Sequence, residues 1–308
     1  MAKIAVEFEK AVAQRGAIGA AAGRPIGDML ARGEGWSVVD LICTSGPLDR
    51  PFEEQHSQIS IALVVAGTFQ YRSTDGGRRG ELMTPGSLLL GNPGQYFECG
   101  HEHGTGDRCL SFSYAPDYFE KITGEARAGR EGRQFRVLRL PSMRSLSRLA
   151  AQACAWLAGS SAQRDDLTLD VAWEELGIQL AASVMRLAND APLEVRDPLP
   201  SVVARVTRAA RMIEENHASE LTIQRLACEA RLSPYHFLRS FQQLMGVTPH
   251  QYLLRVRLRE AAKRLATERA KVLDIALDCG FGDVSNFNRA FRREFGMSPQ
   301  SFRRKGLQ

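Results

Sequence analysis

The chain has 308 residues, of which 44% are hydrophobic and 24% are charged. This is sufficient for about two globular domains of ~150 residues each. The sequence holds no apolar run near the ~18 residues that a membrane span needs, and its first residues lack the basic-then-apolar pattern of a secretory signal. We therefore expect a cytoplasmic protein with no membrane partner.

Positive charge is concentrated at the C-terminal end. Residues 201–308 contain 19 Lys and Arg against 10 Asp and Glu, a net charge of +9, whereas residues 1–200 carry −4. Such a distribution indicates an anionic polymer as the partner of one end only, or else a solvated basic face.

The six cysteines are scattered along the chain, and no two of them form a C-x-x-C pair. This pattern favours free thiols over disulfides or a structural zinc site. No cofactor is expected from it.

Residues 1–35 are rich in Ala and Gly and predict a loosely ordered lead-in. From Trp36 onward, short β-type runs alternate with Gly and Pro turns, and Asp75-Gly76-Gly77 is typical of a hairpin turn. The pattern predicts a cupin-like β-barrel. Its expected strands are Trp36–Thr44, Ile59–Ala66, Thr68–Arg72, Ser87–Leu90, Gln95–Cys99, Arg108–Tyr114 and Phe135–Leu140.

Two helices should complete this sensor domain, which we place at residues 36–189. One runs from Ser142 to about Leu157, and the other runs from Asp165 to near Asn189. The second carries an apolar seam that would pack either onto its own barrel or onto a second copy in a homodimer. The seam consists of Leu169, Trp173, Leu176, Leu180, Val184 and Leu187. Residues 190–201, with three prolines, predict a linker.

Residues 202–308 contain an internal repeat at a shift of 50 positions. Two copies are too few for a solenoid, so a duplicated small module is the better interpretation. The coinciding pairs are Phe237 and Phe287, Arg239 and Arg289, Phe241 and Phe291, Gly246 and Gly296, Pro249 and Pro299, and Tyr252 and Phe302.

Each copy predicts a helix, a tight turn and a second helix. In the first copy, Thr222 caps the short helix and Ser233 caps the second one, which buries Phe237, Phe241 and Leu244 and ends at Gly246. In the second copy, Val272–Cys279 is the short helix, and Asp283 caps a helix that ends at Gly296. A single long helix, Pro249–Leu265, joins the copies.

The second helix of such a unit fits the major groove of DNA, where its first residues meet base edges. Arg239 and Arg289 could bind guanine bidentately, Asn288 could read adenine, and Leu238 or Val284 could touch a thymine methyl group. The full base-reading set is Tyr235, His236, Leu238, Arg239, Val284, Ser285, Asn288 and Arg289. The residues expected to contact phosphate are Arg292, Arg293, Arg303, Arg304 and Lys305.

Two stretches carry a resemblance to a known family. They are LACEARLSPYHFLRSFQQLMGVTPHQYLLRVRLREAAKRL and VLDIALDCGFGDVSNFNRAFRREFGMSPQSFRR. Both resemble the AraC/XylS family of bacterial transcription regulators over about residues 201–305. The resemblance implies a helical domain whose two reading helices enter successive major grooves. It also implies a β-rich sensor domain in front. This chain departs from the family in having apolar Leu238 and Val284 where polar side chains are frequent.

The sensor domain could bind a small organic effector in a pocket lined by Trp36, Phe69 and Tyr71. A second possibility is a metal held by His56, Cys99, His101 and His103, since zinc accepts His and Cys ligands. The upstream residues Glu53–His56 do not supply the H-x-H pattern of catalytic cupins, so no metal is assigned.

These observations predict an α+β protein, not an enzyme, that binds DNA sequence-specifically and regulates transcription. Its expected partners are double-stranded DNA at promoter sites, a small-molecule effector, RNA polymerase and a second copy in a homodimer. The alternatives are a metal-dependent cupin enzyme with a helical accessory domain and an architectural DNA protein without sequence preference.

Overall fold

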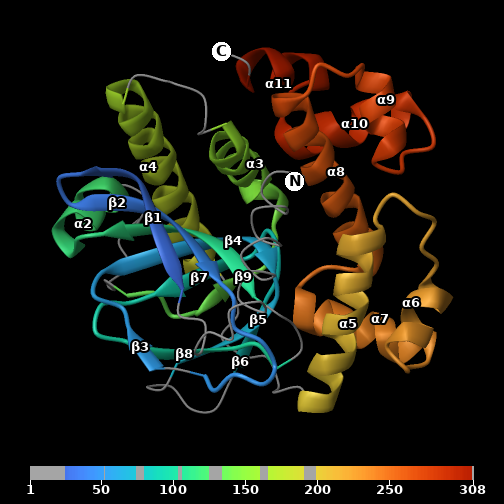
Figure 1. Cartoon of the computed structure of the whole chain (residues 1–308), viewed down its shortest axis with the longest axis horizontal. Coiled ribbons are helices and arrows are strands. Elements are labelled where there is room, and N and C mark those ends of the chain that lie inside the picture. Colours follow the sequence, from blue (N-terminus) through green and yellow to red (C-terminus); the bar gives the residue numbers. More distant parts are fainter. Residues whose placement is uncertain are drawn as a thin grey trace, which may run out of the picture. The chain divides into compact units, whose positions relative to one another are not determined.

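The computed structural model describes residues 25–51, 53–73, 80–102, 106–124, 134–159, 166–190 and 199–306. These residues divide into a sheet unit and a helical unit (Figure 1). The sheet unit extends to Met143 and includes the helix at 166–190, while the helical unit combines residues 144–159 with residues 199–306. Each unit has its own hydrophobic core.

The described strands of the sheet unit form two antiparallel sheets. The larger sheet has the order β1(Ile26–Gly33), β2(Trp36–Cys43), β9(Asp107–Tyr114), β4(Ile59–Gly67), β7(Leu88–Gly91) and β10(Arg139–Leu140). The smaller sheet has the order β3(Glu53–Gln55), β8(Tyr96–Gly100), β5(Phe69–Ser73) and β6(Gly80–Met83). This arrangement confirms the cupin-like fold that the strand pattern predicts.

The predicted strands are found within one or two residues, with one exception. Of Phe135–Leu140, only Arg139–Leu140 pairs as a strand, because the backbone of Phe135 instead exchanges hydrogen bonds of 2.7 and 3.0 Å with the side chain of Asn92. Two short strands, β3 and β6, were not predicted. The turn expected at residues 75–77 lies outside the described residues.

The N-terminal lead-in was predicted too long. Residues 26–33 form β1, which pairs along its whole length with β2. Its sequence has no clear alternation of apolar and polar residues, and most of its residues are exposed. This edge strand is therefore stabilised by pairing with β2 rather than by burial of an apolar face. Residues 1–24 lie outside the described part of the chain.

Helices α2(Pro116–Thr123) and α4(Asp166–Asp190) pack against each other in the sheet unit. The apolar seam of α4 faces its own sheet: Trp173 and Val184 are fully buried, and the Trp173 ring lies 6.1 Å from that of Phe112 on β9. The Tyr114 hydroxyl also donates a 2.8 Å hydrogen bond to the carbonyl oxygen of Gly177. Of the two interpretations of the seam, the structure therefore selects packing onto the barrel.

The helical unit contains α3(Arg144–Gly159), α5(Pro200–Asn216), α6(Ile223–Glu229), α7(Pro234–Met245), α8(Pro249–Thr267), α9(Val272–Asp278), α10(Val284–Phe295) and α11(Pro299–Gly306). The pairs α6–α7 and α9–α10 are the two predicted copies, and they lie toward opposite ends of α8 (Figure 1). No helix in the described ranges is both long and apolar enough to cross a bilayer.

The buried stripe of each second helix repeats at intervals of four residues. In α10 it consists of Phe287, Phe291 and Phe295, and in α7 it consists of Phe237, Phe241 and Met245. Leu244, which we expected in the α7 stripe, is only partly buried. Met245 occupies the place that Phe295 has in the second copy.

The sequence pattern did not predict α5, which begins at Pro200. Residues 191–198 lie outside the described part of the chain, and Leu199 is the N-cap of the helix. Pro200 is tolerated because the first turn of a helix has no intrahelical partner for the backbone N–H. Helix α3 was expected with the sensor domain, but its contacts are with α8 and α10 of the helical unit. Its Ala151 is buried in the same hydrophobic cluster as Leu258 and Phe291.

Candidate functional site

Helices α7 and α10 begin and end in the same way. Ser233 Oγ accepts a hydrogen bond from the backbone N–H of His236, and Asp283 Oδ1 accepts one of 2.6 Å from that of Asn286. At the other end, Gly246 and Gly296 both adopt the left-handed conformation with φ of 73°. Only glycine takes this conformation without strain, so both copies end in the same C-cap.

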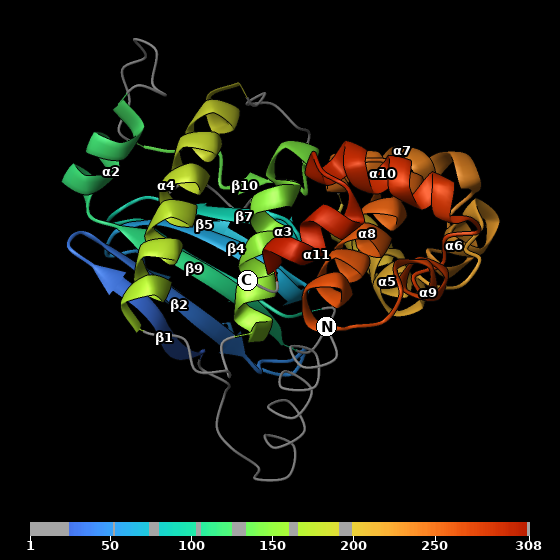
Figure 2. The same ribbon diagram turned by 90° about the horizontal axis from the view of Figure 1, so that it is seen from above.

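The two helices lie on one side of α8. Figure 2 looks along the direction that separates the two copies in Figure 1, and in that view α7 and α10 lie one behind the other. Phenylalanines on one face of α7 and of α10 are buried in the core of the helical unit, so the opposite face of each helix points into solvent. The unit therefore presents the exposed faces of α7 and α10 on the same side of α8.

Six of the eight predicted base-reading side chains are solvent-exposed, and two are partly buried. Tyr235 is 69% exposed and Leu238 is 39% exposed, and Arg239, Ser285 and Arg289 are exposed as well. Val284 and Asn288 are partly buried. His236 is exposed, but its Nδ1 lies 2.9 Å from Ser233 Oγ, which ties the ring to the N-cap.

The residues predicted to contact phosphate differ in exposure and in hydrogen bonding. Arg292, Arg293 and Arg304 are exposed, and their guanidinium groups make no hydrogen bond or ion pair within the described ranges. Arg303 is partly buried and donates a 2.7 Å hydrogen bond to the carbonyl oxygen of Ala270. The side chain of Lys305 lies outside the described residues.

The arginines of α8 face inward and have internal partners. Arg259 forms an ion pair of 2.8 Å with Glu214, Arg264 pairs with Glu268 and Asp278, and Arg257 donates to two backbone carbonyls. These arginines stabilise the long helix against its neighbours and are not available to a partner. The reading helices and α11 nevertheless carry exposed arginines at Arg239, Arg289, Arg292, Arg293 and Arg304.

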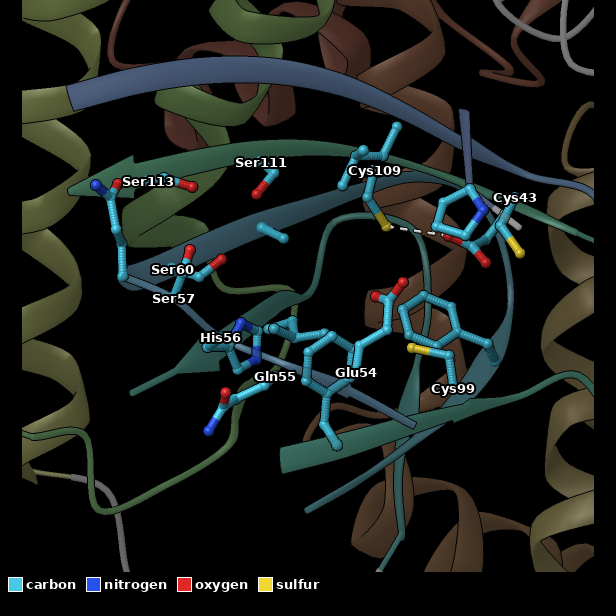
Figure 3. Close-up of a pocket in the computed structure, with 18 residues that line it drawn as sticks. Cys43, Glu54, Gln55, His56, Ser57, Ser60, Cys99, Cys109, Ser111 and Ser113 are labelled. Carbon is cyan, nitrogen blue, oxygen red and sulfur yellow. Dashed lines mark hydrogen bonds between the residues drawn. The ribbon is translucent and has the colours of Figure 1, made fainter. Parts of the chain in front are cut away.

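The sheet unit encloses a cavity of about 240 Å³ between its two sheets. Figure 3 shows Cys109, Ser111 and Ser113 along β9, with Glu54, Gln55 and His56 across the cavity from them. Alternate residues of a strand point to the same face, so β9 supplies one thiol and two hydroxyls to one wall. Phe69, Phe97, Leu41 and Leu89 supply apolar surface.

Of the three residues predicted to line an effector pocket, one is among the residues that line this cavity. Phe69 lines the cavity. Tyr71 is buried behind it, and its hydroxyl lies 2.8 Å from His56 Nε2. Trp36 is buried at the start of β2 opposite Tyr114 and is not among the described residues that line the cavity.

Of the side chains considered as possible metal ligands, His56 and Cys99 are not grouped with His101 in the described part of the chain. His56 stacks on Phe97 at 4.2 Å, and burial lowers its pKa to about 4, so its ring is neutral at pH 7. His103 lies outside the described residues. His101 Nε2 lies 2.6 Å from Asp107 Oδ1, and Cys43 is close to both.

Sequence reasoning missed Cys43 and Asp107. They are directly opposite each other across the β2–β9 pair, although 64 positions separate them in the chain. Only the pairing of these strands, which is not a local property, brings the two side chains to the same place.

Comparison with known families gives two matches. A helix-turn-helix domain model matches residues 226–305, and a model of the AraC-like ligand binding domain matches residues 39–177. The chain belongs to the AraC/XylS family. This membership agrees with the family that the two C-terminal stretches resemble, and it favours a regulator of the AraC/XylS family over a metal-dependent cupin enzyme.

Curated relatives of this AraC/XylS-family protein match about a third of the chain. The probable transcriptional regulator LumQ of Photobacterium leiognathi is 43% identical over 91 residues, and the HTH-type transcriptional activator RhaS of Klebsiella pneumoniae is 39% identical over 100 residues. These matches span 29% and 32% of this chain and 36% of each relative. A solved AraC-type regulator from Chromobacterium violaceum is 28% identical, with a TM-score of 0.33, and the match covers 34% of this chain and 93% of that one.

Proposed function

We propose that this protein is a sequence-specific DNA-binding transcription regulator controlled by a small-molecule effector in the sensor cavity. The observation that carries the proposal is the duplicated helix-turn-helix, which exposes Arg239 and Arg289 at matched places on α7 and α10. The second helix of such a unit is the element that enters the major groove, and guanine is the base that arginine reads best.

In this proposal the two helices divide the reading of one DNA site. Arg239 and Arg289 each bind a guanine, while Leu238 and the partly buried Val284 offer apolar contact to thymine methyl groups. Asn288, which is partly buried, is the candidate for reading adenine. The capped N-termini of α7 and α10 add a favourable position for a phosphate.

The exposed Arg292, Arg293 and Arg304 supply affinity without sequence preference. Each arginine that neutralises a phosphate releases condensed counterions, so affinity should fall steeply as salt rises. Arg303 is better assigned to holding α11 in place, because its guanidinium is bonded to the Ala270 carbonyl.

The effector fits the cavity by chemistry and size. Hydroxyl groups of Ser60, Ser111 and Ser113 face apolar rings across a volume of about 240 Å³, slightly below the range of ~300–1,000 Å³ that is usual for ligand pockets. A small, polar organic molecule suits this lining. Its binding would shift the population of conformations competent for DNA binding.

We also propose that the protein acts in the cytoplasm as a homodimer and contacts RNA polymerase at promoters. These proposals rest on membership of the family. The apolar seam of α4 does not support the dimer, because it is buried against its own sheet. Light scattering of the purified chain would measure the oligomeric state directly.

The test of the proposed function is selection of genomic fragments by the purified full chain. A regulator should enrich a small set of sequences that share one motif, with affinity for that motif falling steeply between low and physiological salt. Enrichment of fragments without a shared motif would indicate the architectural alternative. Failure to retain any fragment above background would reject DNA binding altogether.

A further inference from the structure

Three buried side chains of different chemistry meet at one end of the sensor cavity. Cys43 ends β2, His101 follows β8, and Asp107 begins β9. One potential ligand atom from each lies within 4.8 Å of those of the other two. The register of β2 and β9 places Cys43 and Asp107 directly opposite each other, so the strand pairing itself builds this cluster.

His101 is the member of this cluster that has a ring nitrogen without a hydrogen-bond partner among the described residues. Its side chain is 1% exposed, and Nε2 lies 2.6 Å from Asp107 Oδ1. The second ring nitrogen, Nδ1, is buried without a hydrogen-bond partner in the described part of the chain. A buried polar atom without a partner costs free energy, and a bound ion is one way to satisfy such an atom.

Two further thiols surround the cluster. Cys109 Sγ donates a 3.2 Å hydrogen bond to Asp107 Oδ2, and both Cys99 and Cys109 line the cavity together with Cys43 and Asp107. Figure 3 shows the three sulfur atoms at the same end of the cavity. The six cysteines, all of which the structure describes, form no disulfide, so these thiols are in the form that binds metals after losing a proton.

We propose that Cys43, His101 and Asp107 bind a thiophilic divalent cation, with Zn²⁺ as the best fit. Sulfur, imidazole nitrogen and carboxylate oxygen are the three ligand types of zinc, with bond lengths of about 2.0–2.3 Å. Ligand atoms of a tetrahedral site are therefore about 3.5 Å apart, and the three atoms here already lie within 4.8 Å of one another. A thiolate ligand disfavours Mg²⁺ and Ca²⁺, which prefer oxygen.

The fourth position of this site faces the cavity. Cys99 or Cys109 can fill it, or it can remain open to a water molecule or an effector. Binding through His101 Nδ1 displaces the thiol proton of Cys43 and any proton on Nδ1, and these protons leave through the cavity, while Nε2 keeps its hydrogen bond to Asp107 Oδ1. The site would make the sensor domain respond to a metal ion, and it does not depend on whether the helical unit binds DNA.

The test is a Co²⁺ titration of the full chain after reduction and removal of metals by a chelator. Cobalt replaces zinc in such sites and gives an absorption band from thiolate-to-metal charge transfer. We expect the band to saturate at one ion per chain and to disappear when Zn²⁺ is added, whereas Mg²⁺ leaves it unchanged. Saturation without a thiolate band, or far below one ion per chain, would overturn the proposal.

Variants assign the ligands. Cys43→Ser and His101→Gln should each weaken Co²⁺ binding by about tenfold or more, and Cys43→Ser should remove or reduce the charge-transfer band. Cys228→Ser and His250→Gln remove an exposed thiol and an exposed imidazole of the helical unit and serve as matched controls. Unchanged binding by Cys43→Ser, or equal losses in the controls, would contradict the assignment. Circular dichroism checks the fold of each variant, and Asp107→Asn tests the site again if one variant is unfolded.

Discussion

Arg144 on α3 donates a 2.6 Å hydrogen bond from its Nε to the backbone carbonyl oxygen of Arg293, although 149 positions separate the two residues. Arg293 is in the last turn of α10, where carbonyl groups lack partners within the helix and favour a nearby cation. The Ser147 hydroxyl on α3 donates a hydrogen bond to the side-chain carboxylate of Glu294, which is also in the last turn of α10. Helix α3 thus holds the C-terminal end of α10 and leaves the reading end exposed.

Burying a charge between α3 and α8 should destabilise the helical unit. Ala151 is 5% exposed within the cluster that contains Leu258 and Phe291, so Ala151→Asp places a carboxylate there without a partner. We expect a loss of about 3 kcal/mol in the free energy of unfolding, measured by urea denaturation. Arg148→Asp, which changes an exposed position of the same helix, should change it by less than about 0.5 kcal/mol. Equal effects would show that α3 is not part of this core.

Removing an exposed arginine beyond the reading positions should affect all DNA sequences alike. Arg292→Ala and Arg304→Ala should reduce the slope of log affinity against log salt by about 1 each, and they should weaken specific and nonspecific binding in the same proportion. Fluorescence anisotropy at several salt concentrations measures both quantities. A loss confined to the specific site would mean that these side chains read bases.

Arg303 should behave as a structural residue. Its guanidinium is bonded to the Ala270 carbonyl oxygen at 2.7 Å and is partly buried, so Arg303→Ala leaves that carbonyl without its partner. We expect the free energy of unfolding to fall by about 1–3 kcal/mol, while the salt slope stays close to that of the unchanged protein. The opposite result, a reduced slope with normal stability, would place Arg303 among the phosphate contacts.

Lys263 should make stability depend on pH. Burial lowers the pKa of its amine from 10.5 to about 8, and Nζ has no hydrogen-bond partner among the described residues. The unfolded chain then binds more protons than the folded chain between pH 8 and 10.5, so this group's contribution to stability rises with pH across that window.

Lys263→Met should therefore raise the free energy of unfolding at pH 7 by about 1–3 kcal/mol and remove the rise at alkaline pH. Lys271→Met, at an exposed position, is the matched control and should leave both unchanged. A destabilised Lys263→Met protein would show that the amine has a favourable partner.

The sequence predicts the helical unit well because its signals are local. Each of these signals acts within one helix. They are the N-caps Ser233 and Asp283, the left-handed Gly246 and Gly296, and the phenylalanines spaced four residues apart. The cluster at Cys43, His101 and Asp107 was missed because it depends on which strands pair and in what register. The same reason explains β1, which lacks alternation and forms only because β2 offers it a partner.

The seam of α4 illustrates a further limit of the sequence. Its spacing is correct for a helix with one apolar face, and Trp173 and Val184 are indeed buried. Spacing alone cannot tell whether the covering surface belongs to the same chain or to a second copy. Contacts of α4 with Phe112 and Tyr114 on β9 decide the question in favour of the same chain.

The most direct test of the proposed function is a footprint of the full chain on its selected DNA site, with Arg239→Ala and Arg289→Ala beside Arg32→Ala as an exposed control on β1. We predict two protected patches about one helical turn, or ~10.5 base pairs, apart on one face of the duplex. Each reading variant should lose sequence preference in one patch, at a cost of about 1–3 kcal/mol, while Arg32→Ala binds normally. A single patch, or reading variants that bind like Arg32→Ala, would contradict the account.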